Sequence, residues 1–271
     1  MSGPDDARLG ELTDDAICGE WRIWQRRRGH RYSLDDLATA WEAVSARPGA
    51  RRYCDLGSGI GSVLLMVSYK LAPSCAKAAV EAQAISFELL RRNVARNGLT
   101  AALWHGDLRD PELAAHVGAG FDLVTGTPPY VPPGKGSPST DEQRTYARIE
   151  MRGGVEDYLA AASRILADDG ALVVCCDART PERAIEGGVK ANLHARRRRD
   201  VVPRAGRKGA LFSVWTFVKQ PCELVIEPAL VARDEGGGRT ETAHALRRFF
   251  DLPVDEDEPA SPGLERRPRG R

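Results

Sequence analysis

Short apolar runs alternate along the chain with longer stretches in which apolar residues recur every three or four positions. The first pattern is typical of buried strands, and the second is typical of helices that cover a sheet. The predicted strands are residues 51–56, 76–80, 101–104, 121–124, 171–176 and 211–218, and the predicted helices are residues 33–41, 62–71, 83–96, 155–166 and 181–192. Ser33 and Asp36 are predicted to cap the first of these helices. This alternation predicts an α/β fold, with a mostly parallel sheet that has helices on both faces and ends in an antiparallel pair.

The two ends of the chain lack this alternation. Residues 1–20 are predicted to be a flexible lead-in, and residues 21–250 a single α/β domain. Within that domain, Val201-Val202-Pro203 is predicted to be an edge strand, because proline lacks the N–H that an interior strand donates. Residues 219–250 are predicted to form an appended strand and helix. The charged, proline-rich end, residues 254–271, is predicted to be disordered.

A glycine-rich turn follows the first predicted strand. The sequence Asp55-Leu56-Gly57-Ser58-Gly59-Ile60-Gly61 leads directly into a predicted helix. Gly57 and Gly59 permit a tight turn and a close approach of a ligand to the backbone. Position 62 is not glycine, so the glycine fingerprint of dinucleotide-binding turns is incomplete. The acid at position 55 would repel a pyrophosphate but suits an ammonium group, so the turn favours S-adenosylmethionine over NAD.

Acidic residues end the next two predicted strands. Glu81 lies roughly 20 residues after the glycine turn, where a carboxylate can grip the ribose hydroxyls of a cofactor. The alternative for Glu81 is a charge that caps the following helix. Asp107 follows the third strand and can accept a hydrogen bond from the exocyclic amine of an adenine ring, or it can be a simple turn residue. His105, two residues earlier, is assigned a structural role.

The fourth predicted strand runs into Gly126-Thr127-Pro128-Pro129-Tyr130. Neither proline can donate to a strand ladder, and each restricts the residue before it to extended geometry. The strand therefore ends in a stiff loop with Tyr130 at its tip. Ligands of open α/β sheets bind outside the carboxyl ends of the strands, so this loop is placed to grip a planar group that carries an amine or amide. Residues 131–153, rich in Pro, Gly, Ser and Thr, are predicted to be a long substrate loop.

The composition is that of an ordinary globular protein, with 42% hydrophobic and 28% charged residues. A formal net charge of +1 gives no global signal for nucleic acid, so any such contact must come from local clusters. No apolar run approaches the roughly 20 residues needed to cross a bilayer. The first ten residues lack the apolar core of a signal peptide. We therefore expect a cytoplasmic protein without membrane contact, and we assume a monomer.

The chain has six cysteines, most of them in apolar stretches and none in a C-x-x-C pair. They are Cys18, Cys54, Cys75, Cys175, Cys176 and Cys222. This pattern favours buried, reduced thiols over disulfides or zinc ligands, and no metal site is predicted.

Two segments concentrate arginine. Residues 21–32 interleave Trp and Tyr with Arg, and residues 196–199 are four consecutive arginines. Aromatic stacking and phosphate neutralisation would suit a nucleic acid. The alternative, given equal weight, is an ordinary solvated basic face.

Taken in order along the chain, these motifs resemble the class I S-adenosylmethionine-dependent methyltransferases, which have a Rossmann-like fold with a seven-stranded, mostly parallel sheet. More narrowly, the chain is similar to the bacterial tRNA1(Val) adenine-N6 methyltransferases, which act beside the anticodon of a valine tRNA. The resemblance covers residues 20–250. Its carriers are DLGSGIG, the TPPY loop, and the segments GHRYSLDDLATAW, VEAQ, RRNVARNGL, YARIE, VEDYLAAASRILADDGAL, LFSVWTFVK and VIEPALVARDEGGGRTETAHAL.

The resemblance implies a role for each matching residue. The residues implied to bind S-adenosylmethionine are Asp55, Gly57, Ser58, Gly59 and Glu81 around its methionine and ribose parts, Asp107 and Leu108 at its adenine ring, and Ser33 and Asp35 as further walls of the site. The implied catalytic loop is Thr127, Pro128, Pro129 and Tyr130. Tyr130 would stack on a base turned out of a single-stranded tRNA loop, so tRNA is the expected partner.

One residue departs from the family pattern. The family begins this loop with Asn, or with Asp or Ser in wider relatives, and here the residue is Thr127. The Asn carbonyl accepts one hydrogen of the target amine, and the first proline carbonyl accepts the other. A Thr hydroxyl can also accept, but it is shorter and must direct its own proton elsewhere. One neutral hydrogen bond is worth about 0.5–1.5 kcal/mol, or roughly three- to tenfold in rate, so the substitution also admits a shifted substrate.

Three other functions compete with this interpretation. A protein glutamine N5-methyltransferase would use a similar Pro-Pro-Tyr loop to hold a side-chain amide. Such enzymes typically carry an N-terminal helical domain, whereas only 20 residues precede Trp21 here. A non-catalytic subunit that binds S-adenosylmethionine or RNA would have lost activity at Thr127 and would bind the cofactor without turnover. A dinucleotide-dependent oxidoreductase is disfavoured by the missing third glycine.

Overall fold

A computed structural model of the chain describes residues 9–137 and 139–254. The predicted disordered tail therefore lies, from residue 255 onward, outside the described residues. The strands are β1 Leu12–Cys18, β2 Trp21–Arg26, β3 Arg52–Leu56, β4 Ala76–Glu81, β5 Ala102–His105, β6 Phe121–Gly126, β7 Leu166–Asp177, β8 His194–Val202, β9 Phe212–Val218 and β10 Val225–Val231. The helices are α2 Leu34–Ala46, α3 Ser62–Lys70, α4 Ala84–Arg96, α5 Leu113–Val117, α6 Glu142–Arg148, α7 Val155–Ile165, α8 Pro181–Lys190 and α9 Glu241–Phe249.

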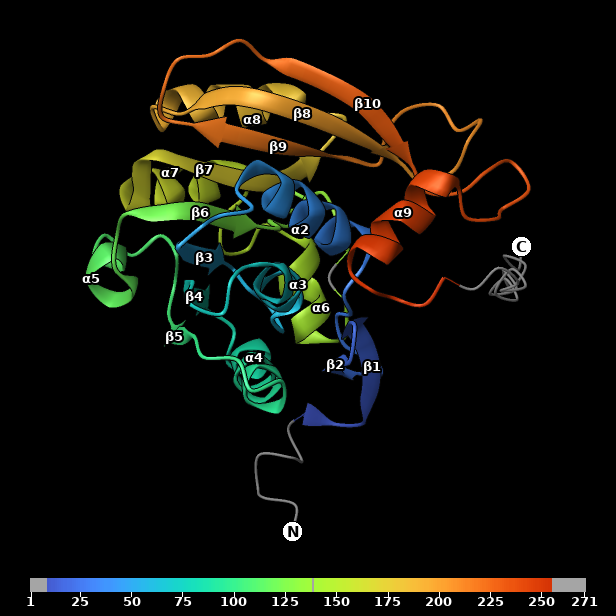
Figure 1. Ribbon diagram of the computed structural model, residues 1–271, viewed down its shortest axis with the longest axis horizontal. Helices are drawn as coiled ribbons and strands as arrows, with labels where there is room; N and C mark the ends of the chain where they lie inside the picture. The colour runs from blue at the N-terminus through green and yellow to red at the C-terminus, as the bar shows by residue number, and fades with distance from the viewer. Residues whose placement is uncertain (1–8, 138, 255–271) are drawn as a thin grey trace.

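The described residues form one large sheet in the order β10-β8-β9-β7-β6-β3-β4-β5 (Figure 1). β3 to β7 are mutually parallel where they pair, and β9 runs antiparallel to both β7 and β8. The predicted fold class, a mostly parallel sheet with helices on both faces and an antiparallel pair near its end, is confirmed. The sheet has eight strands rather than the predicted seven, because the appended strand β10 joins it alongside β8.

The prediction that Val201-Val202-Pro203 forms an edge strand was wrong. β8 lies between β9 and β10, so it is an interior strand. Pro203 does not prevent this, because β8 ends at Val202 and the proline takes no part in the ladder. The run of arginines at 196–199 lies inside β8 rather than ahead of it.

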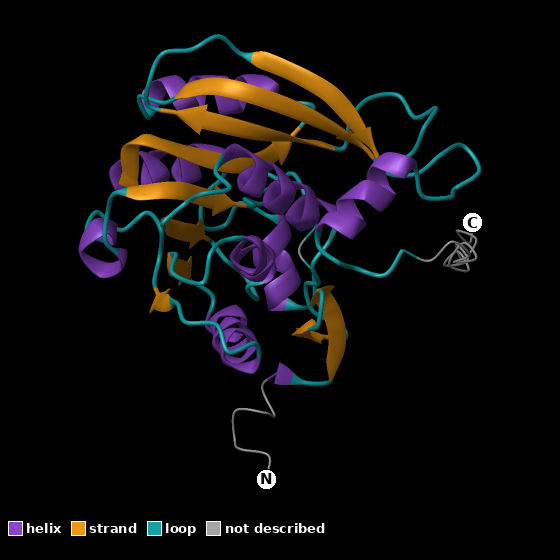
Figure 2. Cartoon of the chain, in the orientation of Figure 1, coloured by secondary structure: helices purple, strands orange, loops and turns teal. Residues whose placement is uncertain are grey.

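Apolar side chains on the two faces of the sheet build two cores. Buried residues of α2, α3 and α4 pack on one face, and those of α5, α7 and α8 pack on the other. Strand β9 contributes to both by alternation: Phe212 and Val214 face the first core, and Trp215 and Phe217 face the second. Figure 2 shows the resulting three layers, with the purple helices on either side of the orange strands.

Part of the predicted flexible lead-in is a strand. β1 pairs with β2 in a two-stranded antiparallel sheet. Asparagine side chains of α4 fix this hairpin to the domain: the Asn93 amide accepts from the backbone N of Trp24 at 2.7 Å and donates to its carbonyl at 3.0 Å. Asn97 makes the same pair of bonds with Arg22, at 2.9 and 2.8 Å. The side-chain amides of Asn93 and Asn97 thus pair with the backbone of β2 as a neighbouring strand would.

The predicted long loop, residues 131–153, contains α6 and is tied to the domain at its base. The backbone N of Glu150 donates to the carbonyl of Val131 at 2.9 Å, which closes the segment on itself. The Glu150 carboxylate accepts two bonds from the Arg183 guanidinium of α8, at 2.7 and 3.0 Å. Such a bidentate pair fixes orientation as well as distance, so α6 is held against the carboxyl ends of the strands.

The described residues include neither a membrane span nor a metal cluster, and their cysteines are not paired. None of the helices has the length and apolar character that crossing a membrane requires. No group of three or more His, Cys, Asp or Glu side chains is arranged to hold a metal ion within residues 9–137 and 139–254. The six cysteines, all of which lie in that part of the chain, are free thiols, and all but Cys222 are buried.

Candidate active site

The turn between β3 and α3 requires glycine. Gly57, Gly59 and Gly61 have φ angles of 59°, 58° and 92°, in the left-handed region that other residues rarely adopt. Gly57 also has no room for a side chain, because a Cβ there would lie 2.0 Å from the Tyr158 hydroxyl oxygen of α7. Apart from its chain neighbours, no atom of the described residues lies within 4 Å of the position that a Cβ of Gly59 would take. The backbone at Gly59 is therefore open to a ligand.

Asp55 lies behind this turn rather than in front of it. Its buried carboxylate accepts hydrogen bonds from Ser58 Oγ at 2.6 Å and from Thr125 Oγ1 at 2.6 Å. Burial raises the pKa of Asp55 to about 6, although both hydroxyls oppose the shift. The predicted cofactor acid thus holds the glycine turn against β6, and its effect on a ligand passes through charge and through Ser58.

Glu81, at the end of β4, is also buried and is bound from two sides. Its Oε2 accepts from the backbone N of Gly59 at 2.8 Å, and its Oε1 accepts from the backbone N of Gln83 at 2.7 Å. Burial raises the pKa of Glu81 to about 7, and these two bonds and the charge of Arg152 act against that rise. The carboxylate therefore links the glycine turn to the start of α4.

Asp107 and Leu108 follow the end of β5. The Asp107 carboxylate accepts from Arg109 Nη2 at 2.7 Å and from the backbone N of Arg109 at 2.9 Å. Arg109 holds the pKa of Asp107 below its ordinary value, so this carboxylate is ionised at neutral pH. Leu108 is buried, and its carbonyl accepts from Arg164 Nη2 of α7 at 2.7 Å, which fixes the turn.

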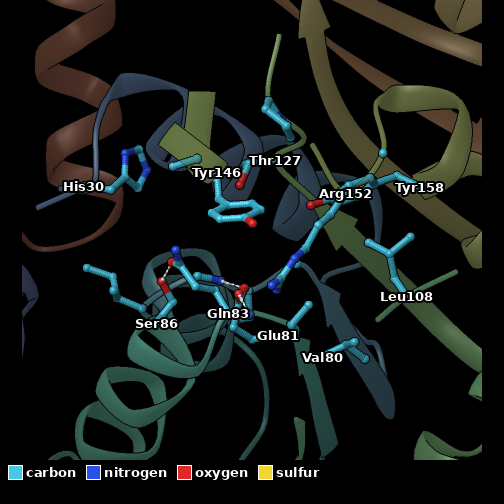
Figure 3. A pocket seen from close by; sticks show the side chains of 18 of the residues that line it. His30, Val80, Glu81, Gln83, Ser86, Leu108, Thr127, Tyr146, Arg152 and Tyr158 are labelled. Atoms are coloured by element: carbon cyan, nitrogen blue, oxygen red, sulfur yellow. Dashed lines mark hydrogen bonds between the residues drawn. The ribbon is translucent and has the colours of Figure 1, made fainter. Parts of the chain in front are cut away.

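These turns surround a cleft with an empty volume of about 840 Å³, the first cleft (Figure 3). Six of the nine residues predicted to bind the cofactor line it: Gly57, Ser58, Gly59, Glu81, Asp107 and Leu108. Tyr146 and Arg152, from α6 and the turn after it, project into it opposite Glu81. The Arg152 guanidinium lies over the Tyr146 ring, 4.6 Å from its centre.

A second cleft, with an empty volume of about 1480 Å³, lies on the other side of the proline loop. Its lining includes the remaining predicted residues Ser33, Asp35, Pro128 and Tyr130. Ser33 and Asp35 thus do not meet the other predicted cofactor residues. Thr127 and Pro129 line both clefts, so the start of the predicted catalytic loop is the partition between them.

The sequence predicted Tyr130 at the tip of a stiff loop, but in the structure its side chain packs against the core. Its ring lies parallel to Phe212 of β9, with ring centres 6.4 Å apart. Its hydroxyl is 2.9 Å from Cys175 Sγ and 3.3 Å from the Asp35 carboxylate. Burial raises the pKa of Tyr130 well above its ordinary value, so the hydroxyl stays protonated. The ring turns back onto the core because Phe212 and Cys175 offer apolar surface that two preceding prolines allow it to reach.

Asp36 is a site residue that the sequence analysis assigned only to a helix cap. The cap is confirmed: the Asp36 carboxylate accepts from the backbone N of Ser33 at 2.9 Å. The same carboxylate also accepts from Ser62 Oγ, at 3.1 Å, at the first residue of α3. It is buried, lines both clefts, and has a pKa raised by that burial and by the neighbouring Asp35. Other lining residues that were not predicted are Gln83, Tyr146, Arg152 and Tyr158.

Most arginines of the two predicted clusters form ion pairs within the protein, a use that neither a nucleic-acid contact nor a solvated basic face had anticipated. The ion pairs include Arg22 with Asp14, Arg26 with Asp141, Arg27 with Glu11, Arg31 with Asp15, Arg197 with Glu227, Arg198 with Asp200 and Arg199 with Glu42. Arg28 and Arg196 are exposed. Two arginines outside the clusters, Arg144 and Arg148, are exposed on α6 and line the second cleft.

Comparison with known proteins adds to this geometry. No family model matches the chain. Over 176 residues, which are 64% of this chain and 70% of the relative, it is 30% identical to the tRNA1(Val) (adenine(37)-N6)-methyltransferase of Aeromonas hydrophila subsp. hydrophila. The chain belongs to this methyltransferase family. The resemblance predicted from the sequence motifs is thereby confirmed.

Other relatives extend the comparison. The enzyme of the same name from Bacteroides thetaiotaomicron is 24% identical over 78% of this chain and 88% of its own length. A release factor glutamine methyltransferase from Agrobacterium fabrum is 29% identical over 52% of this chain and 47% of its own length. Among solved structures, a predicted O-methyltransferase from Agrobacterium tumefaciens has a TM-score of 0.61 at 18% identity, covering 83% of this chain and 100% of that one. The last match supports the fold.

As a member of this family the chain is a methyltransferase that depends on S-adenosylmethionine. The polar groups that line the first cleft fit that cofactor. The Glu81 carboxylate has about four lone-pair sites and uses two of them on backbone N–H groups, so it can accept two ribose hydroxyls. Asp36, Asp55 and Glu81 are buried carboxyls in or behind the cleft whose pKa values burial raises. The sulfonium and ammonium of the methyl donor would offset their charge.

Proposed function

We propose that this methyltransferase transfers a methyl group to the exocyclic N6 amine of an adenine in tRNA, and that it acts in the cytoplasm. The observation that carries the proposal is the partition between the clefts. Thr127 and Pro129 border both the first cleft, which contains the residues suited to the methyl donor, and the second cleft. A group bound in the second cleft against Thr127 can therefore face a methyl group held in the first.

S-adenosylmethionine supplies a methyl carbon on a positively charged sulfur, which leaves with the bonding electrons when the amine nitrogen attacks. The reaction needs alignment of nitrogen, carbon and sulfur more than it needs a strong base, and positioning alone can supply about 7–11 kcal/mol. In this chain, Thr127 Oγ1 and the Pro128 carbonyl are the acceptors proposed for the two amine hydrogens. With both hydrogens held, the nitrogen lone pair points at the methyl carbon, and one proton is lost to water after transfer.

Two exposed arginines of the second cleft suit a nucleic acid. Arg144 and Arg148 are four residues apart, so they lie on the same face of α6, and both are exposed along the cleft. Guanidinium groups pair readily with phosphate oxygens. A base turned out of a single-stranded loop would enter between them and Thr127, at a lower energetic cost than a base taken from a duplex. The Aeromonas and Bacteroides relatives are named for such an adenine in tRNA.

One alternative function has support of its own. The similarity to a release factor glutamine methyltransferase favours a protein glutamine side chain as methyl acceptor. A primary amide presents two N–H hydrogens to the same pair of acceptors, so Thr127 and Pro128 would serve equally. The arginines of α6 distinguish the two functions, since an amide substrate does not require them. A non-catalytic S-adenosylmethionine-binding or RNA-binding subunit is the third outcome to be tested.

The deciding experiment supplies tritiated S-adenosylmethionine with total tRNA or with a protein extract. We expect label in tRNA that digests to N6-methyladenosine. Thr127→Val, which keeps the shape of the side chain and removes its acceptor oxygen, should reduce that label. The matched control is Thr13→Val, which alters a threonine of β1. Label in protein as N5-methylglutamine would support the alternative, and bound donor with no label in either pool would indicate a non-catalytic subunit.

A further inference from the structure

Gln83 carries an unpaired polar atom into the first cleft. It precedes α4 as its N-cap residue and is only 8% exposed. Within the described residues its Nε2 has no hydrogen-bond partner, although its Oε1 has one. Leaving a buried N–H unpaired costs about 1–3 kcal/mol, so a native structure that keeps one needs a reason for it.

The direction of the Gln83 amide is set by groups outside the cleft, and the first of these is Gln143 of α6. Gln143 is 2% exposed, and its Oε1 accepts from the backbone N of His30 at 3.2 Å and from Arg26 Nη1 at 3.3 Å. Both partners are donors and neither can accept, so the oxygen end of Gln143 must face them. Its amide nitrogen then faces Ser86 Oγ, at 3.2 Å.

Ser86 transmits this direction to Gln83. A serine hydroxyl has a single hydrogen, and Ser86 Oγ already accepts from Gln143. In the structure Ser86 Oγ donates to Gln83, whose Oε1 lies 2.7 Å away. The oxygen end of Gln83 then has its partner, and Nε2 is turned toward the cleft on the side of Tyr146 and His30 (Figure 3).

Glycine at position 29 makes this arrangement possible. A Cβ there would lie 2.2 Å from Gln143 Oε1, so any larger residue would push the amide away from His30 and Arg26. The relay therefore depends on residues from three distant segments: the loop after β2, the start of α4, and α6. The last donor of this relay, Gln83 Nε2, has no hydrogen-bond partner among the described residues.

The position of that donor indicates its partner. Gln83 is two residues from Glu81 and bonds to it through its backbone N, at 2.7 Å. Asp107 and Leu108 line the same cleft. We infer that Gln83 Nε2 donates a hydrogen bond to an acceptor on the nucleoside part of the methyl donor, a ring nitrogen or a ribose oxygen, and that Gln143 and Ser86 are positioning residues for it. The inference rests on S-adenosylmethionine binding in the first cleft, and it does not depend on the identity of the methyl acceptor.

The test is calorimetric binding of S-adenosylhomocysteine to the full chain. Gln83→Met keeps the length of the side chain and removes the donor, so we expect roughly three- to tenfold weaker binding. Ser86→Ala frees the amide to turn, so we expect binding to weaken about twofold, since half of the orientations still donate. Ser68→Ala is the matched control, because it removes another buried, unpaired polar group from α3, outside the cleft lining, and should leave affinity unchanged.

Melting of the ligand-free variants separates binding from structure. A lower melting temperature for Gln83→Met with unchanged affinity would overturn the inference, as would equal affinity and stability. Gln83→Ala, which also removes the donor and adds no charge beside Glu81, gives the same comparison if the Met variant does not fold. The 3-deaza and 2′-deoxy forms of S-adenosylhomocysteine then locate the acceptor: the analogue that binds Gln83→Met and the unaltered protein equally well lacks it.

Discussion

The two clefts that meet at Thr127 and Pro129 differ in the parts of the fold that contribute most to them. The first is centred on the ends of β3, β4 and β5, with glycine backbone and buried carboxyls, and α6 and the turn after it cover one side. The second is built from loops and from α6, and its charged lining includes the exposed Arg144 and Arg148. Strand ends are fixed by the sheet, whereas loops can change without disturbing it. The methyl-donor side therefore belongs mainly to the sheet, and we expect acceptor specificity to depend on the segments placed on it.

The largest effect that would test this division is expected at Glu81. Glu81→Gln removes a buried carboxylate acceptor from the first cleft, so S-adenosylhomocysteine should bind roughly ten- to a hundredfold more weakly, because charge-assisted hydrogen bonds are worth about 1.5–3 kcal/mol. Binding of RNA to the second cleft should not change. Calorimetric titration with S-adenosylhomocysteine and, separately, with RNA measures the two affinities. Glu42→Gln is a matched control, since Glu42 is a buried glutamate paired with Arg199, away from both clefts. Equal weakening in the two variants would contradict the division.

The affinity of the first cleft for S-adenosylhomocysteine should also depend on pH, through Glu81. Burial raises the pKa of Glu81 to about 7, above its ordinary value of 4.5. A raised carboxyl pKa means that the fold is favoured with Glu81 protonated, and this contribution is lost as pH rises from about 4.5 through 7. A ligand that donates to the carboxylate favours its ionised form, so binding should tighten about fivefold from pH 6 to pH 7 and level off above about pH 8.

Calorimetry across that range, in the unaltered protein and in Glu81→Gln, tests the assignment. The other ionisable groups in or just behind this cleft are His30, Asp36, Asp55, Asp107, Tyr146, Arg152 and Tyr158. Asp107 is ionised throughout, because Arg109 lowers its pKa. A slope that survives in Glu81→Gln would show that His30, Asp36 or Asp55 carries it instead.

The contrast between the clefts also explains what could be predicted from the sequence. Gly57, Glu81 and Asp107 could be predicted to line one cleft because each lies at or just after the end of a strand, and strand ends of a parallel sheet converge at one edge. Asp55 carried the same signal, but its carboxylate turned inward because Thr125 of β6, 70 residues away, offers a partner. Local sequence cannot show that choice.

Most of the second cleft could not be predicted from the sequence, for a related reason. α6 lies in a Pro- and Gly-rich segment without a clear apolar stripe, and its position depends on the ion pair between Glu150 and Arg183 and on the buried amide of Gln143. The edge strand was mispredicted because Pro203 was counted as part of it, whereas β8 ends one residue earlier. In each instance an interaction between distant segments decided what a local pattern left open.

The exposed arginines of α6 give a smaller test of the second cleft. Replacing Arg144 and Arg148 together with alanine should weaken tRNA binding about fivefold, if each exposed ion pair with a phosphate contributes about 0.5 kcal/mol. The slope of log affinity against log salt should fall by about two, one for each phosphate that is no longer neutralised. Affinity for S-adenosylhomocysteine should be unchanged. The matched control is the double alanine variant of Arg28 and Arg196, which are exposed but do not line the cleft. An equal decrease in that control would mean that RNA binds by the clusters predicted from the sequence.

The smallest effect is expected at the partition itself. Thr127→Asn restores the amide carbonyl with which the family begins this loop, so it should raise the rate of methyl transfer to tRNA about threefold, the lower end of what one neutral hydrogen bond supplies. Since the amide acts on the aligned amine, kcat should rise while KM for tRNA and affinity for S-adenosylhomocysteine stay the same. Single-turnover assays with tritiated donor measure this directly.

The opposite result would be equally informative about the partition. Thr127 is partly exposed and borders both clefts, so a longer side chain has room only if the acceptor group stands farther from it than the threonine hydroxyl reaches. If Thr127→Asn slows transfer to tRNA while Thr127→Val slows it further, the hydroxyl is matched to its own substrate. Specificity would then be determined at a residue that borders both clefts.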